Sequence, residues 1–277
     1  RMIEYPTACL GVVRRSGRRR ELRGHDVVSS YIVAETGRRY DAVMATYKRI
    51  MLKLSGEVFS GNGSNIDRDT LDAVATSIAE VAASGIQLAI VVGGGNIWRY
   101  RDMKTVGIER AVSDGMGMLA TIMNSVALQS ALEHIGCHTR VLSAVNVPQL
   151  AEPYIRRRAL RHLEKGRVVI CAGGTGNPYF TTDSAAALRA SELECNVLLK
   201  GTDVDGIYDK DPDMHPDATL FTTLSYQEAI AKNLGVMDQA AFSLCREQEL
   251  PIRVFNFFKK GALLDAAKGE AVGTLVH

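Results

Sequence analysis

Four glycine-containing turns each follow a short apolar run, and this pattern indicates a phosphate site. Such a turn lets the backbone approach a ligand closely and offer N–H groups to an anion. If the apolar runs are parallel strands, their carboxyl ends bring the turns to one edge of a sheet, where ligands gather. The turns are Ser55-Gly56, Gly93–Gly95, Gly173–Gly176 and Gly201.

The longest glycine stretch, Gly173–Ala186 (GGTGNPYFTTDSAA), carries polar side chains as well. It leads into an Ala-rich segment that should begin a helix near Asp183, so a positive helix end would face the turn. No Lys-Ser or Lys-Thr pair follows the glycines, which excludes a Walker loop. Asn177, Thr181 and Thr182 can hydrogen-bond a polar ring or a sugar, so we expect this turn to bind a small molecule.

Lys53 and Arg99 supply positive charge beside two of the turns. Lys53 interrupts the apolar run 49–54, where a lysine is costly unless it meets an anion or emerges at the strand end. The Ser55-Gly56 turn that follows favours a phosphate role over a snorkelling edge lysine. Arg99 follows the Gly93–Gly95 turn and can fork two hydrogen bonds to a phosphate, although a lone arginine is commonly a surface charge.

Asp114 permits two interpretations. It can be the N-cap of a helix expected over 116–133, or it can accept hydrogen bonds from ribose hydroxyls. The spacing of Gly115, Gly117 and Ala120 resembles a dinucleotide fingerprint, but it lies in a helix-like stretch and not after a strand, so we reject that match.

The polar segment 201–216 follows an apolar run and is rich in turn residues. Its Asp-Gly and Asp-Pro pairs favour turns, and its acids are too irregular for a calcium loop. If the segment binds a nucleotide, Tyr208 would lie near an adenine and a neighbouring acid near a ribose. No Ser/His/Asp or Cys/His arrangement has local support in the sequence.

Apolar runs alternate with helical patterns along the chain. This order predicts an α/β fold, a three-layer sandwich with a mostly parallel central sheet and helices on both faces. We expect strands at 49–54, 87–92, 140–145, 167–171, 196–200, 252–257 and 273–276. We expect helices near 71–82, 116–133, 183–192, 225–232 and 238–248.

The composition suits a globular enzyme. The 277 residues are 46% hydrophobic with a net charge of +2, and the single Trp argues against a base-stacking surface, so no nucleic-acid partner is expected. No apolar run approaches the length of a membrane span, so no membrane partner is expected either. Five scattered Cys suit reduced thiols in the cytoplasm, and the six His give no metal pattern.

The first 46 residues differ from the rest of the chain. They hold nine Arg, no Lys and five acids, whereas the rest carries a slight negative charge. The acids argue against a transit peptide and against a nucleic-acid arm. We expect a disordered extension or an over-long gene start, with the natural start at Met44.

Several motifs, in this order, resemble the bacterial uridylate kinases (UMP kinases) of the amino-acid-kinase fold. The Gly174–Asp183 string is the specific one, whereas the Lys-Leu-Ser-Gly start is shared across the wider fold. The resemblance begins near Tyr47, so residues 47–277 are expected to form a single kinase domain. The motifs are Lys53–Glu57, Gly93–Asn96 with Arg99, Asp114–Met118, Gly174–Asp183, Val204–Gly206, Val236–Asp238 and Ile252–Asn256.

The resemblance implies the reaction UMP + ATP → UDP + ADP, with Mg²⁺. It implies catalytic roles for Lys53, Asp183 and Asp238, with Asp183 orienting the lysines that clamp phosphate. The residues implied for ATP are Lys53, Leu54, Ser55, Gly56, Gly95, Arg99, Thr202, Tyr208 and Asp211. The residues implied for UMP are Gly94, Asp114, Thr175, Gly176, Asn177, Pro178, Tyr179, Phe180, Thr181 and Thr182.

The resemblance also implies a homohexamer that serves pyrimidine nucleotide biosynthesis, with GTP as activator and UTP as inhibitor. The chain departs from the family at Tyr100, where a glycine is common, and at Asp203, where a lysine is frequent. The extension of 46 residues has no family counterpart.

Two other functions remain open on the sequence. One is a kinase of the same fold that phosphorylates a carboxylate such as acetylglutamate or aspartate, against which the Gly174–Asp183 string argues. The other is a non-catalytic nucleotide-binding regulator or storage protein, although Lys53, Arg99 and Asp183 favour activity.

Overall fold

A nine-stranded sheet runs through the part of the chain that the computed structural model describes, residues 47–99 and 107–277. The extension 1–46 and Tyr100 lie outside the described residues. The strand order is β4-β3-β5-β2-β1-β6-β8-β9-β7, and every neighbouring pair is parallel except β8 and β9. The strands are β1 (Arg49–Leu54), β2 (Gln87–Val92), β3 (Thr139–Ser143), β4 (Glu152–Pro153), β5 (Val168–Ala172), β6 (Val197–Thr202), β7 (Thr223–Leu224), β8 (Ile252–Asn256) and β9 (Thr274–Val276).

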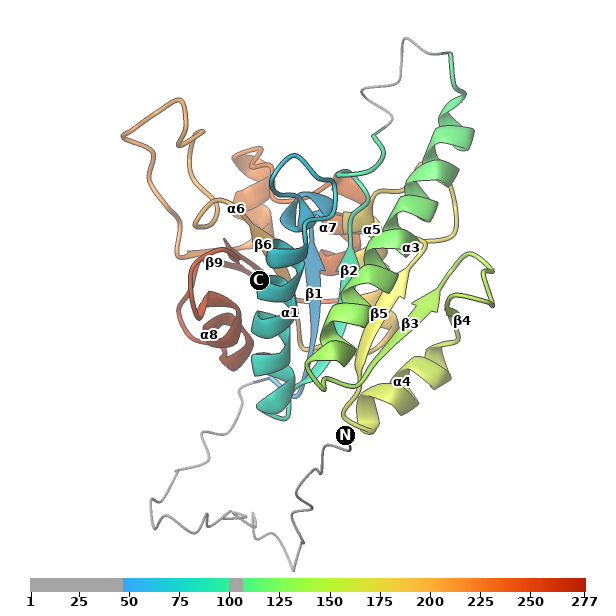
Figure 1. Ribbon diagram of the computed structural model, residues 1–277. Helices are drawn as coiled ribbons and strands as arrows, with labels where there is room; N and C mark the ends of the chain where they lie inside the picture. The colour runs from blue at the N-terminus through green and yellow to red at the C-terminus, as the bar shows by residue number, and fades with distance from the viewer. Residues whose placement is uncertain (1–46, 100–106) are drawn as a thin grey trace, which may run out of the picture. The chain divides into compact units, whose positions relative to one another are not determined.

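Helices cover both faces of this sheet (Figure 1). One buried cluster joins the sheet to α1, α3 and α8, and a second joins it to α4, α5, α6 and α7. This arrangement confirms the predicted three-layer α/β sandwich. The helices are η1 (Gly56–Phe59), α1 (Arg68–Ala83), α3 (Arg110–His134), α4 (Arg156–Glu164), α5 (Thr182–Glu192), α6 (Tyr226–Ala231), α7 (Gln239–Glu247) and α8 (Ala262–Lys268).

The alternation of side chains along β1 decides which way Lys53 points. Ile50, Leu52 and Leu54 belong to the cluster on the α1 and α3 face, whereas Met51 belongs to the cluster on the α5 face. Because successive side chains of a strand point to opposite faces, Lys53 shares the face of Met51. The α5 helix lies close to the sheet there because its buried face is built from alanines.

The helix α3 begins earlier than the sequence indicated. It starts at Arg110 with Glu109 at its N-cap, so Asp114 lies inside the helix and its interpretation as an N-cap is wrong. The two glycines that follow Asp114 weaken a helix by about 1 kcal/mol each, but tertiary contacts outweigh that cost. One such contact is the hydrogen bond from Trp98 Nε1 to Ser113 Oγ, at 2.9 Å.

Several short elements were not predicted. The helix α4 has a weak apolar pattern, because it contains four arginines and a glutamate and only Ala159, His162 and Leu163 are buried on it. The strands β4 and β7 have two residues each, and η1 and α8 have four and seven. Elements of this length carry too little periodicity to be read from a sequence.

None of the helices in residues 47–99 and 107–277 is long and apolar enough to cross a membrane. Among those residues, Cys137, Cys171, Cys195 and Cys245 are free thiols, and the last three are buried. Burial raises the pKa of Cys171 to about 12, so this thiol stays protonated and packs as a small apolar group.

Candidate active site

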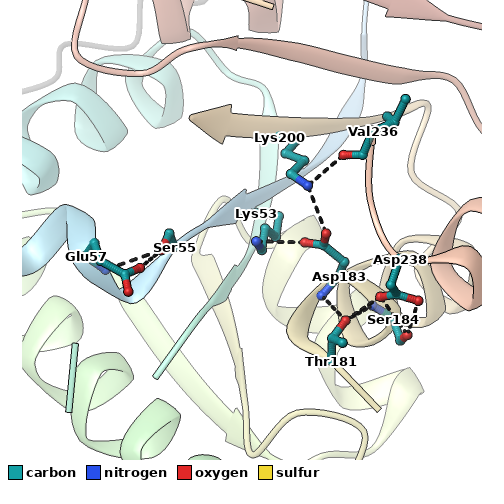
Figure 2. Close-up of polar contacts among 9 residues, drawn as sticks. All are labelled: Lys53, Ser55, Glu57, Thr181, Asp183, Ser184, Lys200, Val236 and Asp238. Carbon is teal, nitrogen blue, oxygen red and sulfur yellow. Dashed lines mark hydrogen bonds and ion pairs between the residues drawn. The ribbon is translucent and has the colours of Figure 1, made fainter. Parts of the chain in front are cut away.

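Two lysines on neighbouring strands form the centre of the candidate site. Lys53 of β1 and Lys200 of β6 are register partners in a parallel pair, so their side chains leave the sheet side by side on the α5 face. Figure 2 shows both ammonium groups directed at Asp183 of α5. Lys53 Nζ lies 2.7 Å from Asp183 Oδ1, and Lys200 Nζ lies 2.9 Å from Asp183 Oδ2.

The three charged groups are mostly buried, with side-chain exposures of 12% for Lys53, 16% for Lys200 and 13% for Asp183. Burial alone would raise the pKa of Asp183, but the attraction of the two ammonium groups outweighs it and holds that pKa below its ordinary value. Burial lowers the pKa of Lys200, and the neighbouring carboxylate opposes that shift only in part. With both lysines protonated, the cluster carries one net positive charge, which suits it to an anionic ligand.

The start of α5 is held in place by Asp238. Thr181 is the N-cap of α5 and accepts hydrogen bonds from the N–H groups of Asp183 (3.1 Å) and Ser184 (3.2 Å). The hydroxyls of Thr181 and Ser184 both donate to the carboxylate of Asp238 (Figure 2). Asp238 also caps α7 by accepting from Ala241 N–H at 3.0 Å. The contacts of Asp238 therefore fix the helix that carries Asp183, and its predicted catalytic role stays a prediction.

A pocket of about 360 Å³, named here the turn pocket, lies between α3 and the glycine turn 174–182. Of the residues predicted for UMP, seven line it and Gly176, Pro178 and Tyr179 do not. Gly95 and Arg99, predicted for ATP, line it as well. The seven are Gly94, Asp114, Thr175, Asn177, Phe180, Thr181 and Thr182.

Close backbone packing shapes the turn pocket. A Cβ added to Gly94 would lie 2.9 Å from Gly117 O, so only glycine lets α3 approach this turn. Thr121 of α3 accepts a hydrogen bond from Gly173 N–H at 3.0 Å. Asp114 accepts from Arg110 Nε at 2.9 Å and from Tyr179 N–H at 2.8 Å, which ties α3 to the far end of the glycine turn.

A second pocket of about 420 Å³, named here the lysine pocket, opens over the two lysines. Ser55, Arg99 and Thr202, all predicted for ATP, line it together with Lys53 and Lys200. Arg99 also lines the turn pocket, so its guanidinium stands where the two pockets meet.

A third pocket of about 550 Å³, named here the loop pocket, adjoins the lysine pocket. Thr202 and Lys200 line both, and Tyr208 and Asp211 line the loop pocket alone. The sequence therefore predicted residues in each of the three pockets. Neighbouring pockets share lining residues, so the three pockets adjoin one another in a row.

Leu54 and Gly56 differ from the other residues predicted for ATP. The Leu54 side chain is fully buried in the core. A Cβ added to Gly93 would lie 2.9 Å from Gly56 N, so these two turns pack backbone against backbone. Any contact of Leu54 or Gly56 with a nucleotide would use backbone atoms.

Sequence reasoning missed several residues that line the pockets. Lys200 is the most important, and it carried the same signal as Lys53, a lysine near the carboxyl end of an apolar strand. Glu57 of the lysine pocket ends the motif Lys53–Glu57 but was given no role. The others have no distinguishing pattern in the sequence and include Phe258 of the lysine pocket and Trp98, Arg110, Ser113 and Thr121 of the turn pocket.

The residues present fit a magnesium ion that enters with a triphosphate. Within residues 47–99 and 107–277, no group of three or more His, Cys, Asp or Glu is arranged to hold a metal. Asp183 is engaged by two lysines, whereas Asp203 lines the lysine pocket as an exposed carboxylate. Mg²⁺ in kinase sites is usually held by one or two carboxylates and the substrate phosphates, which this donor set can satisfy.

A mostly parallel sheet that directs two neighbouring lysines into a pocket suits a small-molecule kinase of the α/β class. The chain matches the model of the amino acid kinase family over residues 48–256, and it belongs to that family.

Three solved structures show which members the chain is similar to. A UMP kinase from Bacillus anthracis is 38% identical with a TM-score of 0.81, over 83% of this chain and 96% of that one. A UMP kinase from Ureaplasma parvum is 39% identical with a TM-score of 0.79, over 83% and 98%. A uridylate kinase from Archaeoglobus fulgidus is 28% identical with a TM-score of 0.64, over 82% and 99%.

Proposed function

We propose that this protein is a UMP kinase, which transfers the γ-phosphoryl group of ATP to UMP. The observation that carries the proposal is the pair Lys53 and Lys200, held by one carboxylate at the floor of a pocket that meets the turn pocket at Arg99. The similarity to two bacterial UMP kinases at 38% and 39% identity supports UMP as the acceptor.

The proposed reaction is an in-line displacement in which the protein supplies position and charge. An oxygen of the UMP phosphate forms a bond to the γ-phosphorus, the bond from that phosphorus to the β,γ-bridging oxygen breaks, and ADP leaves. The UMP phosphate is already a competent nucleophile, so no general base is required. Lys53 and Lys200 stabilise the transferring group, and Arg99 orients it between the pockets.

Magnesium bound with the triphosphate would neutralise part of its charge, next to Asp203 on the wall of the lysine pocket. UMP would occupy the turn pocket, with Asp114 near its ribose and those residues of the 175–182 segment that line the pocket around its ring. ATP would extend from the lysine pocket into the loop pocket, where Tyr208 and Asp211 lie.

Our proposals on assembly, location and regulation rest on the family resemblance alone. They are a cytoplasmic homohexamer in pyrimidine nucleotide biosynthesis, activated by GTP and inhibited by UTP. Size-exclusion chromatography with light scattering, and rates measured with each effector, would test them.

A coupled assay of ADP release tests the proposed function. With ATP and Mg²⁺, we expect ADP release that depends on UMP and not on acetylglutamate or aspartate, with UDP as the second product. Release with a carboxylate acceptor would replace the proposal by the carboxylate-kinase alternative. ATP binding without ADP release from any acceptor would favour a non-catalytic regulator.

A further inference from the structure

The carboxylate of Glu57 lines the lysine pocket beside Arg99, the residue that lines both that pocket and the turn pocket. Its oxygen Oε2 accepts a hydrogen bond from the Ser55 hydroxyl, and its oxygen Oε1 pairs with Nη2 of Arg99. A Cβ added to Gly95 would lie 2.8 Å from Glu57 Oε1, so the carboxylate sits directly over the Gly93–Gly95 turn. Glu57 therefore bridges the two glycine turns with a negative charge.

The partners of Glu57 are groups that the sequence assigned to phosphate. The Ser55 hydroxyl has one proton, so while it donates to Glu57 it cannot donate to a phosphate oxygen. Arg99 donates through Nε to Gly95 O at 2.9 Å and through Nη2 to Glu57, which leaves part of its donor fork for another anion. A phosphoryl group at this point would compete with Glu57 for Ser55 and would share Arg99 with it.

The negative charge of Glu57 strengthens its competition with a phosphoryl group. The lysine pocket holds three cations, Lys53, Lys200 and Arg99, and the carboxylate of Asp183 pairs with both lysines. Asp203 lines the same pocket as an exposed carboxylate and Glu57 pairs with Arg99, so three carboxylates balance the three cations. Like charges held close together repel, so a phosphoryl group gains the full attraction of Arg99 only if the Glu57 carboxylate moves away.

We propose that Glu57 is an internal competitor for the transferring phosphoryl group, whose carboxylate occupies Ser55 and Arg99 and must be displaced before that group can bind. The inference rests on the proposed function, because it takes the transferring group to pass between the two pockets. The side chain is 43% exposed, so it has room to move into solvent. Displacement would cost most for nucleotides that carry the transferring phosphoryl group, ATP and UDP, and little for ADP and UMP, which lack it.

Equilibrium binding to the full chain tests this inference. Glu57→Gln keeps the shape of the side chain and removes its charge. We expect it to lower the Kd of ATP and of UDP by about three- to fivefold, near the upper end of what an exposed ion pair is worth. The Kd values of ADP and UMP should change less than twofold. Glu57→Ala should act in the same direction, which guards against an effect peculiar to the glutamine.

The matched control is Glu80→Gln, which removes an exposed carboxylate from α1 outside all three pockets and should change none of the four Kd values. An unchanged or higher Kd of ATP in Glu57→Gln, or equal shifts for ATP and ADP, would overturn the inference. These measurements need no turnover. If the wild-type protein releases no ADP with UMP while the ATP and ADP effects still separate, the proposed function fails and the role of Glu57 stands.

Discussion

The lysine cluster (Lys53, Lys200 and Asp183) and the turn pocket are built from different parts of the fold. Lys53 and Lys200 extend from the centre of the sheet, are mostly buried and share one carboxylate. The turn pocket is lined largely by loop residues and by one side of α3, and Phe180 on its wall is 54% exposed. Under the proposed function, the sheet fixes the charges that the phosphoryl transfer needs, whereas loops provide the surface that selects UMP.

This difference predicts different consequences of mutation. A buried charge in an ordered sheet stabilises a transferring phosphoryl group strongly, because the side chain needs little rearrangement during the reaction. Exposed loop residues contribute smaller and more separable amounts of binding energy. Changes in the lysine cluster should therefore affect turnover and stability strongly, and changes in the turn pocket should affect the KM of UMP.

Removing either lysine should give the largest effect. We expect Lys53→Ala and Lys200→Ala to lower kcat by about 10²- to 10³-fold, as the loss of a preorganised charge does elsewhere. The Kd of UMP, measured by calorimetry, should change less than about threefold. Lys165→Ala, an exposed lysine after α4, is the control and should leave both values unchanged. Near-normal turnover in Lys53→Ala would contradict the expectation that the lysine cluster controls kcat.

Asp183→Asn should destabilise the fold. It leaves two buried ammonium groups without a carboxylate, and breaking a buried pair costs about 3–5 kcal/mol of unfolding free energy. The pKa of Asp183 is lowered in the folded protein, so its stabilisation is present above the ordinary carboxyl pKa and is lost as the pH falls through the folded value.

Urea unfolding at several pH values checks this second prediction. The difference between wild type and Asp183→Asn should be fully present near pH 6 and should shrink as the pH falls below about pH 4. A difference that already disappears near neutral pH would mean that Asp183 is not held ionised by the two lysines.

Asp114→Asn should give the smallest of these effects. The substitution keeps the size of the side chain but weakens its hydrogen bonds to Arg110 and Tyr179 and to a bound ribose. We expect the KM of UMP to rise about tenfold, with kcat within about threefold of wild type. The KM of ATP is the internal control. If the KM of UMP does not change, the turn pocket is not where UMP binds.

The sequence predicted the regular part of the fold well. Strands β1 and β2 have the expected bounds, because continuous apolar runs that end in glycine turns are typical of buried parallel strands. The start of α3 was placed too late, since Asp114 before the Met- and Ala-rich stretch fitted an N-cap, whereas the helix begins at Arg110. The helix α4 was missed because arginines mask its three buried residues.

Local sequence determined which residues could do chemistry at this site. A lysine near the end of an apolar strand, glycine turns after strands, and the polar Gly174–Asp183 string are visible in the order of the residues. These signals are local because burial, turn geometry and helix starts depend on neighbours along the chain. Together with the family resemblance, they were enough to predict the fold, the phosphate chemistry and some of the residues that line each of the three pockets.

How those residues combine depends on contacts between distant segments of the chain. Lys200 becomes the partner of Lys53 because β6 pairs with β1 in one register, and a shift of one residue would turn its side chain to the other face. Asp183 reaches both lysines because Asp238 ties the start of α5 to α7. Glu57 meets Arg99 because two glycine turns pack backbone against backbone. Each of these contacts joins segments far apart in the chain, and no local pattern specifies such a pairing.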